Sequence, residues 1–461
     1  MPSSPVVTPA GPRLAPLLGG LREALLAAGV AIVATAFAVT LGSAALVLPL
    51  AAAAAYALVR HPPVLLALFV FVPYFEAAPD VSSIPFDPTV GLAALVVFVL
   101  VRRVVSGEGL RMPPAPLLLP LLLIGLAILL GLLWSGAPEY GQEKAVKYFT
   151  VTLLAALAPF ALLTTERDLL KFLYTIAAGA VVVAVLTPIT EPTVAEGIAT
   201  EYDTQGRYSF GGQIFPARFL CTGALILFLL PGLTRSRWAL LAPLAAVGVA
   251  IVASGYGARG PIAAFLATVV AVALILAVRS ARALVAVVVA VVIGAAVLPF
   301  VTVPNSASER IGEAARDPVS TLRGDTRWIL YNQAIELIEG HTVFGAGTGT
   351  YGAYVSIVSP PRQRLLYPHN IFLELWAELG ILPLLAYMLA VGGGGWVLMR
   401  RLAATDDRHE RNLLTLAFGL LVFNFLVTQV SGDINDNRTL LLAASLAWLL
   451  GRYGLGTREA A

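Results

Sequence analysis

Long apolar runs recur along the chain, separated by short polar or charged breaks. A helix needs roughly 20 mostly apolar residues to cross a bilayer, and most of these runs approach that length. The pattern therefore predicts spanning helices at Ala24–Leu41, Ala44–Val59, Pro63–Phe75, Pro88–Val105, Ala115–Trp134, Val146–Leu163, Leu169–Pro188, Gln213–Leu230, Trp238–Ala253, Pro261–Val278, Leu284–Val303, Asn370–Leu389, Leu413–Val430 and Thr439–Tyr453.

Two long polar segments, Glu191–Gly212 and Pro304–His369, interrupt this series. The second and third predicted spans are short or closely joined and can form a re-entrant pair, so we expect 12–14 transmembrane helices. The predicted fold is an all-α polytopic membrane protein with a large, partly helical external loop. We expect N-terminal helices in 1–190, central helices with an arginine-containing loop in 191–303, the large loop in 304–369, and C-terminal helices in 370–461.

Composition supports a membrane protein. Hydrophobic residues make up 58% of the chain and charged residues 12%, against about 25% charged residues in soluble domains. The net charge of +3 is too small to indicate a nucleic-acid partner. A single cysteine, Cys221, excludes a disulfide framework within one chain. No cleavable leader pattern is evident at the start, so we expect the first span to act as a signal anchor.

Basic residues predict the orientation, because short cytoplasmic loops are enriched in arginine and lysine. With the N-terminus inside, one set of loops is short and basic, whereas the opposite set holds the acidic stretches "EAAPDVSSIPFDP" and "SGDINDN". We therefore expect both termini in the cytoplasm and both long polar segments outside. The residues that place the first set inside are Arg60, Arg102, Arg103, Arg111, Arg167, Lys171, Arg235, Arg237, Arg279, Arg282, Arg400, Arg401, Arg408 and Arg411.

Several arginines fall on the predicted external side, where this rule disfavours them. Guanidinium groups stay charged near neutral pH and match phosphate oxygens, so several in one cavity would suit a pyrophosphate. Alternatively, they pair with external carboxylates or lipid phosphates. Arg259 differs because its glycine-rich turn, "SGYGARGP", lies between two long apolar spans and has no carboxylate nearby in the sequence. A charge placed this close to the membrane interior is costly, so we take a functional role as the first hypothesis for Arg259. The external arginines are Arg207, Arg218, Arg259, Arg323 and Arg327.

The second half of the large loop is predicted to be partly structured. Apolar residues in "TRWILYNQAIELIEG" recur near helical spacing, which indicates an amphipathic helix over the membrane face. The following "FGAGTGTYG" resembles a phosphate cradle, but it follows no strand and lacks a P-loop lysine. A flexible connector is the alternative interpretation of these glycines.

His369 stands where this loop meets the next apolar helix, in "YPHNIFLELWAELG". An imidazole titrates nearest neutral pH, so His369 could take a proton from a sugar hydroxyl. A histidine at a helix start can equally have a structural role. Glu374 and Glu378 lie four residues apart on one helix face and could orient substrate hydroxyls. No HExxH or DxD motif indicates a metal site.

These segments resemble the O-antigen ligase and polymerase superfamily of bacterial inner-membrane glycosyltransferases. The family signature places a histidine and an Asn, Ser or Gln before nine residues and a glycine, as His369, Asn370 and Gly380 do here. Pro383 departs from the Gly, Thr or Tyr that closes the signature. "ARGPIAAFLATVV", "TRWILYNQAIELIEGHTVFGAGTGTY" and "GRYSFGG" resemble further family segments, so the resemblance covers residues 200 to 430.

The resemblance implies glycan transfer on the external face by a GT-C-related enzyme, from an undecaprenyl-pyrophosphate donor to a glycan or lipid A-core acceptor. His369 would activate the acceptor hydroxyl and invert the anomeric carbon. Arg207 and Arg259, with Arg327, would hold the pyrophosphate without a metal or other cofactor. Further substrate-binding residues would be Arg323, Arg218, Asn370, Glu378 and Tyr367.

Other classes of protein stay open at this point. A lipid-linked oligosaccharide flippase or a secondary transporter also has 12–14 spans, although transporters are commonly built from repeated halves and no matching pair of motifs occurs here. A structural partner of a polysaccharide machine would tolerate loss of His369. Within the family, ligase and polymerase are not distinguished.

Overall fold

The computed structural model describes residues 47–72, 88–108, 110–190, 214–234, 236–256, 258–277, 326–355 and 367–454. The chain forms two units, residues 1–62 and 63–461. Helix α2 (Val47–Arg60) belongs to the first unit. The predicted spans Ala24–Leu41 and Leu284–Val303, and the residues Arg207 and Arg323, lie outside the described residues.

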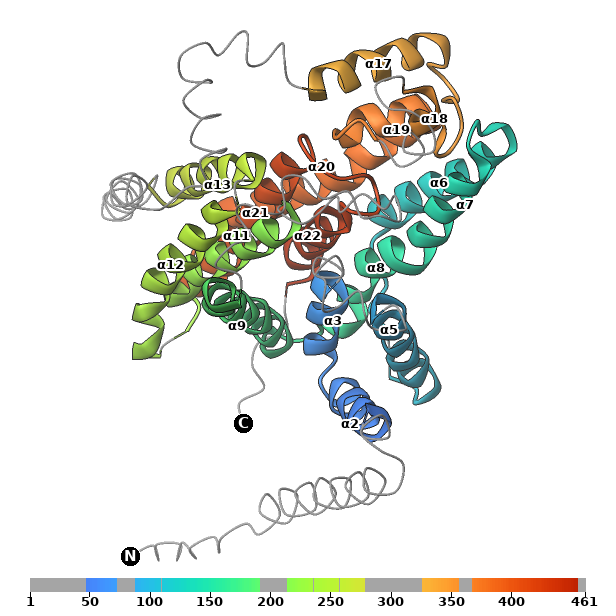
Figure 1. Ribbon diagram of the computed structural model, residues 1–461. Helices are drawn as coiled ribbons and strands as arrows, with labels where there is room; N and C mark the ends of the chain where they lie inside the picture. Colours follow the sequence, from blue (N-terminus) through green and yellow to red (C-terminus); the bar gives the residue numbers. More distant parts are fainter. Residues whose placement is uncertain are drawn as a thin grey trace, which may run out of the picture. The chain divides into compact units, whose positions relative to one another are not determined.

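Seven helices in the described ranges are long and apolar enough to cross a membrane, all in the second unit. This confirms an all-α, multi-pass membrane protein, and the helices are labelled in Figure 1. Further helices accompany them, namely α3 (Pro62–Phe71), α12 (Ala242–Gly255), α13 (Arg259–Ala277) and α22 (Arg438–Trp448). The seven are α5 (Pro88–Val105), α6 (Ala115–Gly131, extended to Trp134), α7 and α8 (Pro138–Lys147 and Leu153–Leu162, joined by a π-turn), α9 (Glu166–Thr190), α11 (Ile214–Leu229), α20 (Ile381–Ala404) and α21 (Arg408–Val427).

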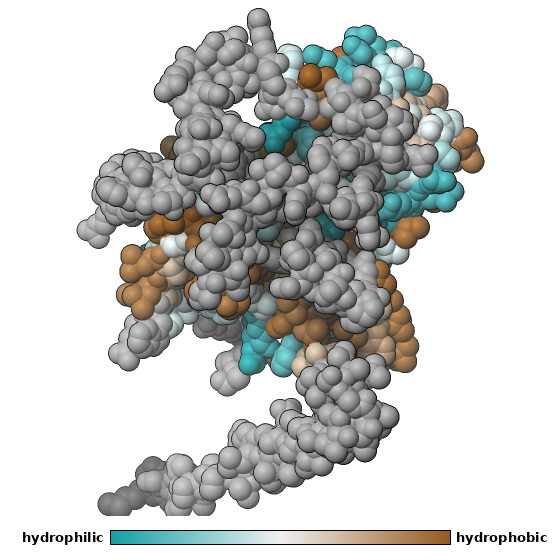
Figure 2. All heavy atoms as spheres, viewed as in Figure 1, coloured by the Kyte–Doolittle hydropathy of each residue, from teal (hydrophilic) through white to brown (hydrophobic). Residues whose placement is uncertain are grey.

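Helix α6 shows how an apolar sequence forms a span. Leu117, Leu121, Ile124 and Ile128 recur at helical spacing and are buried against the protein. The opposite face is equally apolar but exposed, as at Leu126. A helix that is apolar all round is suited to lipid on one side and protein on the other. In Figure 2, hydrophobic surface covers the flanks of the second unit at α12 and α5, and hydrophilic surface gathers near α17 and α18.

The predicted span Asn370–Leu389 was wrong as a single helix. It is divided at Gly380 into α19 (Ile371–Leu379) and α20. Gly380 has φ 89° and ψ −178°, a conformation accessible essentially to glycine alone. The next amide, Ile381 N, donates to Thr342 O at 3.2 Å, so the chain changes direction at a contact with the large loop that precedes α19. Helix α19 is therefore separate from the long membrane span.

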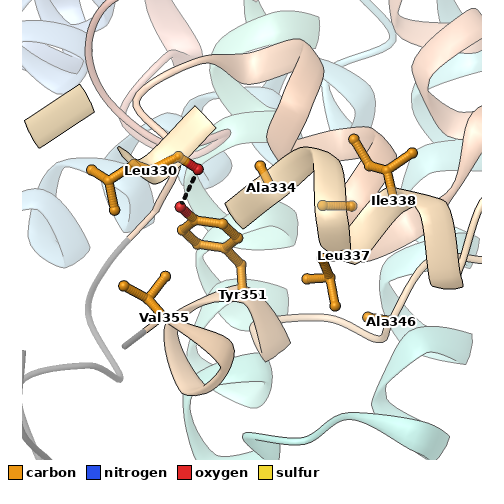
Figure 3. Packing of buried hydrophobic residues seen from close by; sticks show 8 residues of the cluster. Leu330, Ala334, Leu337, Ile338, Ala346, Tyr351 and Val355 are labelled. Atoms are coloured by element: carbon orange, nitrogen blue, oxygen red, sulfur yellow. Dashed lines mark hydrogen bonds between the residues drawn. The ribbon is translucent and has the colours of Figure 1, made fainter. Parts of the chain in front are cut away.

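The large loop that precedes α19 is partly helical, as predicted. It contains α17 (Thr326–Gly340) and α18 (Thr350–Tyr354), which pack with α19 near the ends of α6 and α7 (Figure 1). Figure 3 shows the shared core, in which Tyr351 points toward α17 and its hydroxyl donates to Leu330 O at 2.7 Å. The buried cluster consists of Leu330, Ala334, Leu337, Ile338, Ala346, Tyr351, Val355 and Ala377.

Candidate functional site

His369 is held in an uncommon backbone conformation at the start of α19. Its φ is 57°, and it is the one non-glycine residue with positive φ among those described. The left-handed region costs a residue with a side chain roughly 1–2 kcal/mol, and such strain tends to cluster at functional sites. The residue is buried, and its ring centroid lies 4.4 Å from that of Tyr367. The imidazole is thus fixed in direction by the backbone and by an aromatic neighbour.

Asn370 caps α19 directly after this histidine. Its Oδ1 accepts hydrogen bonds from Phe372 N at 3.0 Å and Leu373 N at 3.1 Å. Asparagine is among the best N-cap residues because its short side chain reaches these otherwise unsatisfied amides. The Asn370 side-chain amide also donates to Gln429 O at 3.3 Å. Asn370 therefore fixes both the beginning of α19 and its distance from the segment after α21.

The segment after α21 joins three elements around His369. Thr428 O accepts from Ile371 N at 3.1 Å, and Gln429 O also accepts from Tyr331 Oη of α17 at 3.1 Å. A Cβ built on Gly260, in the first turn of α13, would lie 2.9 Å from Val430 Cγ2. The starts of α13 and α19 and one face of α17 thus meet at residues 428–430.

The arginines predicted to bind pyrophosphate or other parts of the substrate differ in burial and in their position relative to residues 428–430. Arg259 begins α13, next to the Gly260–Val430 approach, but its side chain lies outside the described part. Arg327 lies half-buried in the first turn of α17. Arg218 is 1% exposed and donates to Asn437 Oδ1 at 3.0 Å and to Thr439 Oγ1 at 3.3 Å. Its observed partners are therefore protein groups at the start of α22.

Glu378 and Glu374 form a buried ion-pair cluster with Lys144 of α7. Lys144 Nζ lies 2.6 Å from Glu374 Oε1 and 2.7 Å from Glu378 Oε2. Burial raises the pKa of Glu374, the adjacent Lys144 ammonium is the strongest opposing influence and favours the carboxylate, and the nearby Asp433 and Glu378 carboxyls add to the rise. Sequence reasoning assigned both glutamates to substrate hydroxyls and did not single out Lys144.

The glycine-rich turn at 345–349 forms neither a flexible connector nor an open phosphate cradle. Its amides are used internally: Ala346 N donates to Ala377 O at 2.8 Å, Gly347 N to Glu378 O at 3.0 Å, and Thr348 N to Gly131 O at 3.2 Å. Gly347 has φ 104°, and a Cβ there would lie 2.8 Å from Ser135 Cα. The glycines are explained by this close packing against the end of α6.

The loop 431–437 between α21 and α22 was read from sequence only as an acidic external stretch. It is mostly buried, and Asp433 Oδ1 accepts from Asn435 N and Asp436 N, both at 2.8 Å. Burial raises the pKa of Tyr367 well above its usual range, with Asp436 and Asp433 the next contributors. This loop therefore lies electrostatically close to Tyr367, whose ring contacts His369 in a tilted arrangement.

Asp436→Asn should stabilise the protein near neutral pH. Burial, and then Asp433, raise the pKa of Asp436 from 3.8 to about 6, although Arg438 and Arg218 oppose them. The folded state therefore binds this proton more tightly than the unfolded chain. The contribution of protonated Asp436 to the free energy of unfolding is fully present below about pH 4 and is lost as the pH rises through 6. Thermal unfolding of the purified protein at pH 7.5 should show a gain on the order of 1–2 kcal/mol.

The same substitution should flatten the fall in stability between pH 4 and pH 7 that is expected for wild type. Asp406→Asn, in the exposed loop between α20 and α21, provides the matched control and should leave the profile unchanged. An Asp436→Asn profile that parallels wild type would contradict the assignment.

Within the described residues, no group of three or more His, Cys, Asp or Glu is arranged to hold a metal ion. The arrangement around His369 combines a buried imidazole, a capped helix start, and the first turn of α13. Helix N-termini present free N–H groups that favour anions. The fold and site thus define a multi-pass membrane protein in which a candidate base and a candidate anion-binding helix end meet at residues 428–430.

Residues 254–388 match the family model described as O-Antigen ligase. The match confirms the predicted resemblance to the O-antigen ligase and polymerase superfamily. It contains His369, Arg259 and Arg327, whereas Lys144, Arg218 and the loop 431–437 lie outside it. No curated protein matches the chain. The match supports a membrane glycosyltransferase of the O-antigen ligase or polymerase type.

Proposed function

We propose that this protein transfers a glycan from an undecaprenyl-pyrophosphate donor to an acceptor hydroxyl at the site around His369. The observation that carries the proposal is the O-antigen ligase match over residues 254–388, the segment that includes His369 and Arg259. The meeting of α13, α17 and α19 at residues 428–430 supports it further, because His369 lies just before α19, and Arg259 and Arg327 lie on α13 and α17.

In the proposed reaction, the acceptor oxygen attacks the anomeric carbon while His369 takes the hydroxyl proton. The bond between the anomeric carbon and the phosphate oxygen breaks, and undecaprenyl pyrophosphate leaves. Because the acceptor oxygen bonds to the opposite side of the anomeric carbon, the configuration of that carbon is inverted. Arg207, Arg259 and Arg327 would stabilise the charge that develops on the leaving group, as fixed donors do in a water-poor site. These arginines would replace a divalent cation.

The remaining predicted residues would support this reaction in different ways. The Tyr367 ring contacts the His369 ring at a tilt of 53° and would orient the imidazole. Asn370, Glu378 and Arg218 bind protein groups, so we propose that they shape the site around the glycan. Arg323 would contact the donor. Acceptors compatible with the family are lipid A-core and another lipid-linked glycan, which makes lipopolysaccharide assembly in the cell envelope the proposed process.

We also propose a bacterial inner-membrane location with both termini in the cytoplasm and the site on the external face. The basic residues of the short loops support this orientation. It is also supported by the position of His369 at the end of Pro304–His369, the longest polar segment of the chain. Surrounding membrane lipids would present the polyprenyl chain of the donor at the height of this site.

Purified protein in lipid vesicles should transfer glycan from a purified lipid-linked donor, with EDTA present throughout. The product distinguishes two activities, because a polymerase gives a ladder of glycan lengths and a ligase gives one capped acceptor. Movement of donor across the vesicle membrane without transfer would instead support a flippase. Transfer only when a divalent cation replaces EDTA would overturn the metal-independent route.

A further inference from the structure

Lys144 is a buried charge that the proposed chemistry does not use. It lies on α7, in the candidate span Pro138–Leu162, and its side chain is 4% exposed. Glu374 and Glu378 are four residues apart on α19, so both carboxylates face the same neighbour. A buried charge is costly unless it is paired. The short contacts of Lys144 with both carboxylates therefore fix α19 against α7.

The same lysine also links two further segments. Its carbonyl accepts a hydrogen bond from Asn435 Nδ2 at 3.2 Å, which ties α7 to the loop 431–437. Glu378 Oε2, already bonded to Lys144, accepts from Gly349 N at 2.9 Å, which ties α19 to the glycine-rich turn. Through Lys144 and its partner Glu378, helix α7, helix α19, the loop 431–437 and the glycine-rich turn are thus linked.

The cluster lies one helical turn from His369. Glu374 N donates to Asn370 O at 3.0 Å, and Asn370 directly follows the histidine. Helix α19 has only nine residues, so a shift at Glu374 is carried to its first turn with little room for bending. The direction of the His369 imidazole accordingly depends on the position of α19 relative to Lys144.

The cluster is closed to substrate. The cavity lined by Lys144, Glu374, Glu378 and Thr348 measures about 10 Å³, enough for one water molecule at most and too small for a sugar or a phosphate. These charges therefore act on other protein groups.

We propose that Lys144 is a positioning residue for the glycan transfer proposed above: by pairing with Glu374 and Glu378 it sets the height and rotation of α19, and so the position of the His369 imidazole. This inference rests on the proposed function. Because Lys144 lies outside residues 254–388, helix α7 would contribute to positioning the site although it is not part of the family match.

The test compares transfer kinetics of three variants with wild type in the vesicle assay. Lys144→Met leaves two buried carboxylates without a cation and should lower kcat at least about tenfold, with the KM for donor changed less than about threefold. Lys144→Glu with Glu374→Lys exchanges the charges at the same positions and should restore kcat to within about threefold of wild type.

The third variant separates positioning from stability. Lys144→Met combined with Glu374→Gln and Glu378→Gln removes all three charges, and buried ion pairs can often be replaced by neutral groups without loss of stability. We expect its thermal stability to recover and its kcat to stay low. Recovery of kcat together with stability would show that the cluster only stabilises the fold and would overturn the proposal.

Each outcome decides between the two proposals. Wild-type rates in Lys144→Met would overturn the positioning role alone. Absence of transfer in wild type would overturn the proposed function, and the positioning role with it. If Lys144→Met does not yield folded protein, the charge exchange decides: restored transfer supports positioning, whereas a folded but inactive exchange overturns it.

Discussion

Replacing His369 by asparagine should abolish glycan transfer while leaving the protein folded and able to bind the lipid-linked donor. Loss of a general base typically lowers a rate 10²- to 10⁴-fold, and a reduction of about that size is expected in single-turnover transfer. Asparagine is the informative replacement because it tolerates the left-handed backbone conformation at φ 57°. The substitution therefore removes the imidazole without adding backbone strain.

His341→Asn provides the matched control. His341 is exposed after α17, and its Nδ1 lies 3.1 Å from Leu337 O. The control should transfer at the wild-type rate and bind donor equally well. A His369→Asn protein within about threefold of wild type would exclude the imidazole as the base, since general-base effects are far larger.

Gly380→Ala should prevent formation of the native junction between α19 and α20. The added Cβ would collide with the Val343 carbonyl, and the backbone conformation at φ 89° and ψ −178° strains any residue with a side chain. We expect a loss on the order of 3 kcal/mol or more, a size reserved for clashes and special backbone positions. Thermal unfolding and the yield of monodisperse detergent-solubilised protein measure it.

Gly392→Ala tests whether this effect is specific to the junction. Gly392 lies within α20, and no atom lies within 4 Å of its added Cβ. Alanine is a better helix former than glycine by about 1 kcal/mol, so this variant should be as stable as wild type or slightly more stable. Equal stability of the two variants would contradict the steric explanation at Gly380.

The membrane spans were predictable because bilayer thickness sets the length of an apolar run. Helix α5 begins at Pro88 and ends at Val105, as its sequence predicted. The break at Gly380 was not predictable in this way, since the residues on both sides are apolar. Its conformation is set by contacts with Val343 and Thr342 in the loop that precedes α19, which no local pattern in α20 reveals.

Some residues of the candidate site could be predicted from the local sequence, and others could not. His369 and Asn370 stand out locally, because a histidine and a good N-cap residue precede an apolar helix. The predicted span at Val146 began too late, since α7 starts at Pro138 and carries its lysines into the helix. Lys144 is tolerated there because Glu374, 230 residues later, neutralises it. A contact between residues so far apart in the chain produces no local sequence pattern from which it could be predicted.

The glycine-rich turn has a consequence for exchanging parts between related proteins. Thr348 Oγ1 donates to Ile128 O at 2.8 Å, Ser135 Oγ donates to Thr348 O at 2.7 Å, and Trp134 Nε1 donates to Gly345 O at 3.2 Å. The turn belongs to the family segment, but its partners come from the connection between α6 and α7. A chimera that grafts residues 254–388 onto another scaffold would leave this joint mismatched unless it also carries residues 128–144. The two stretches form one structural unit and have to be exchanged together.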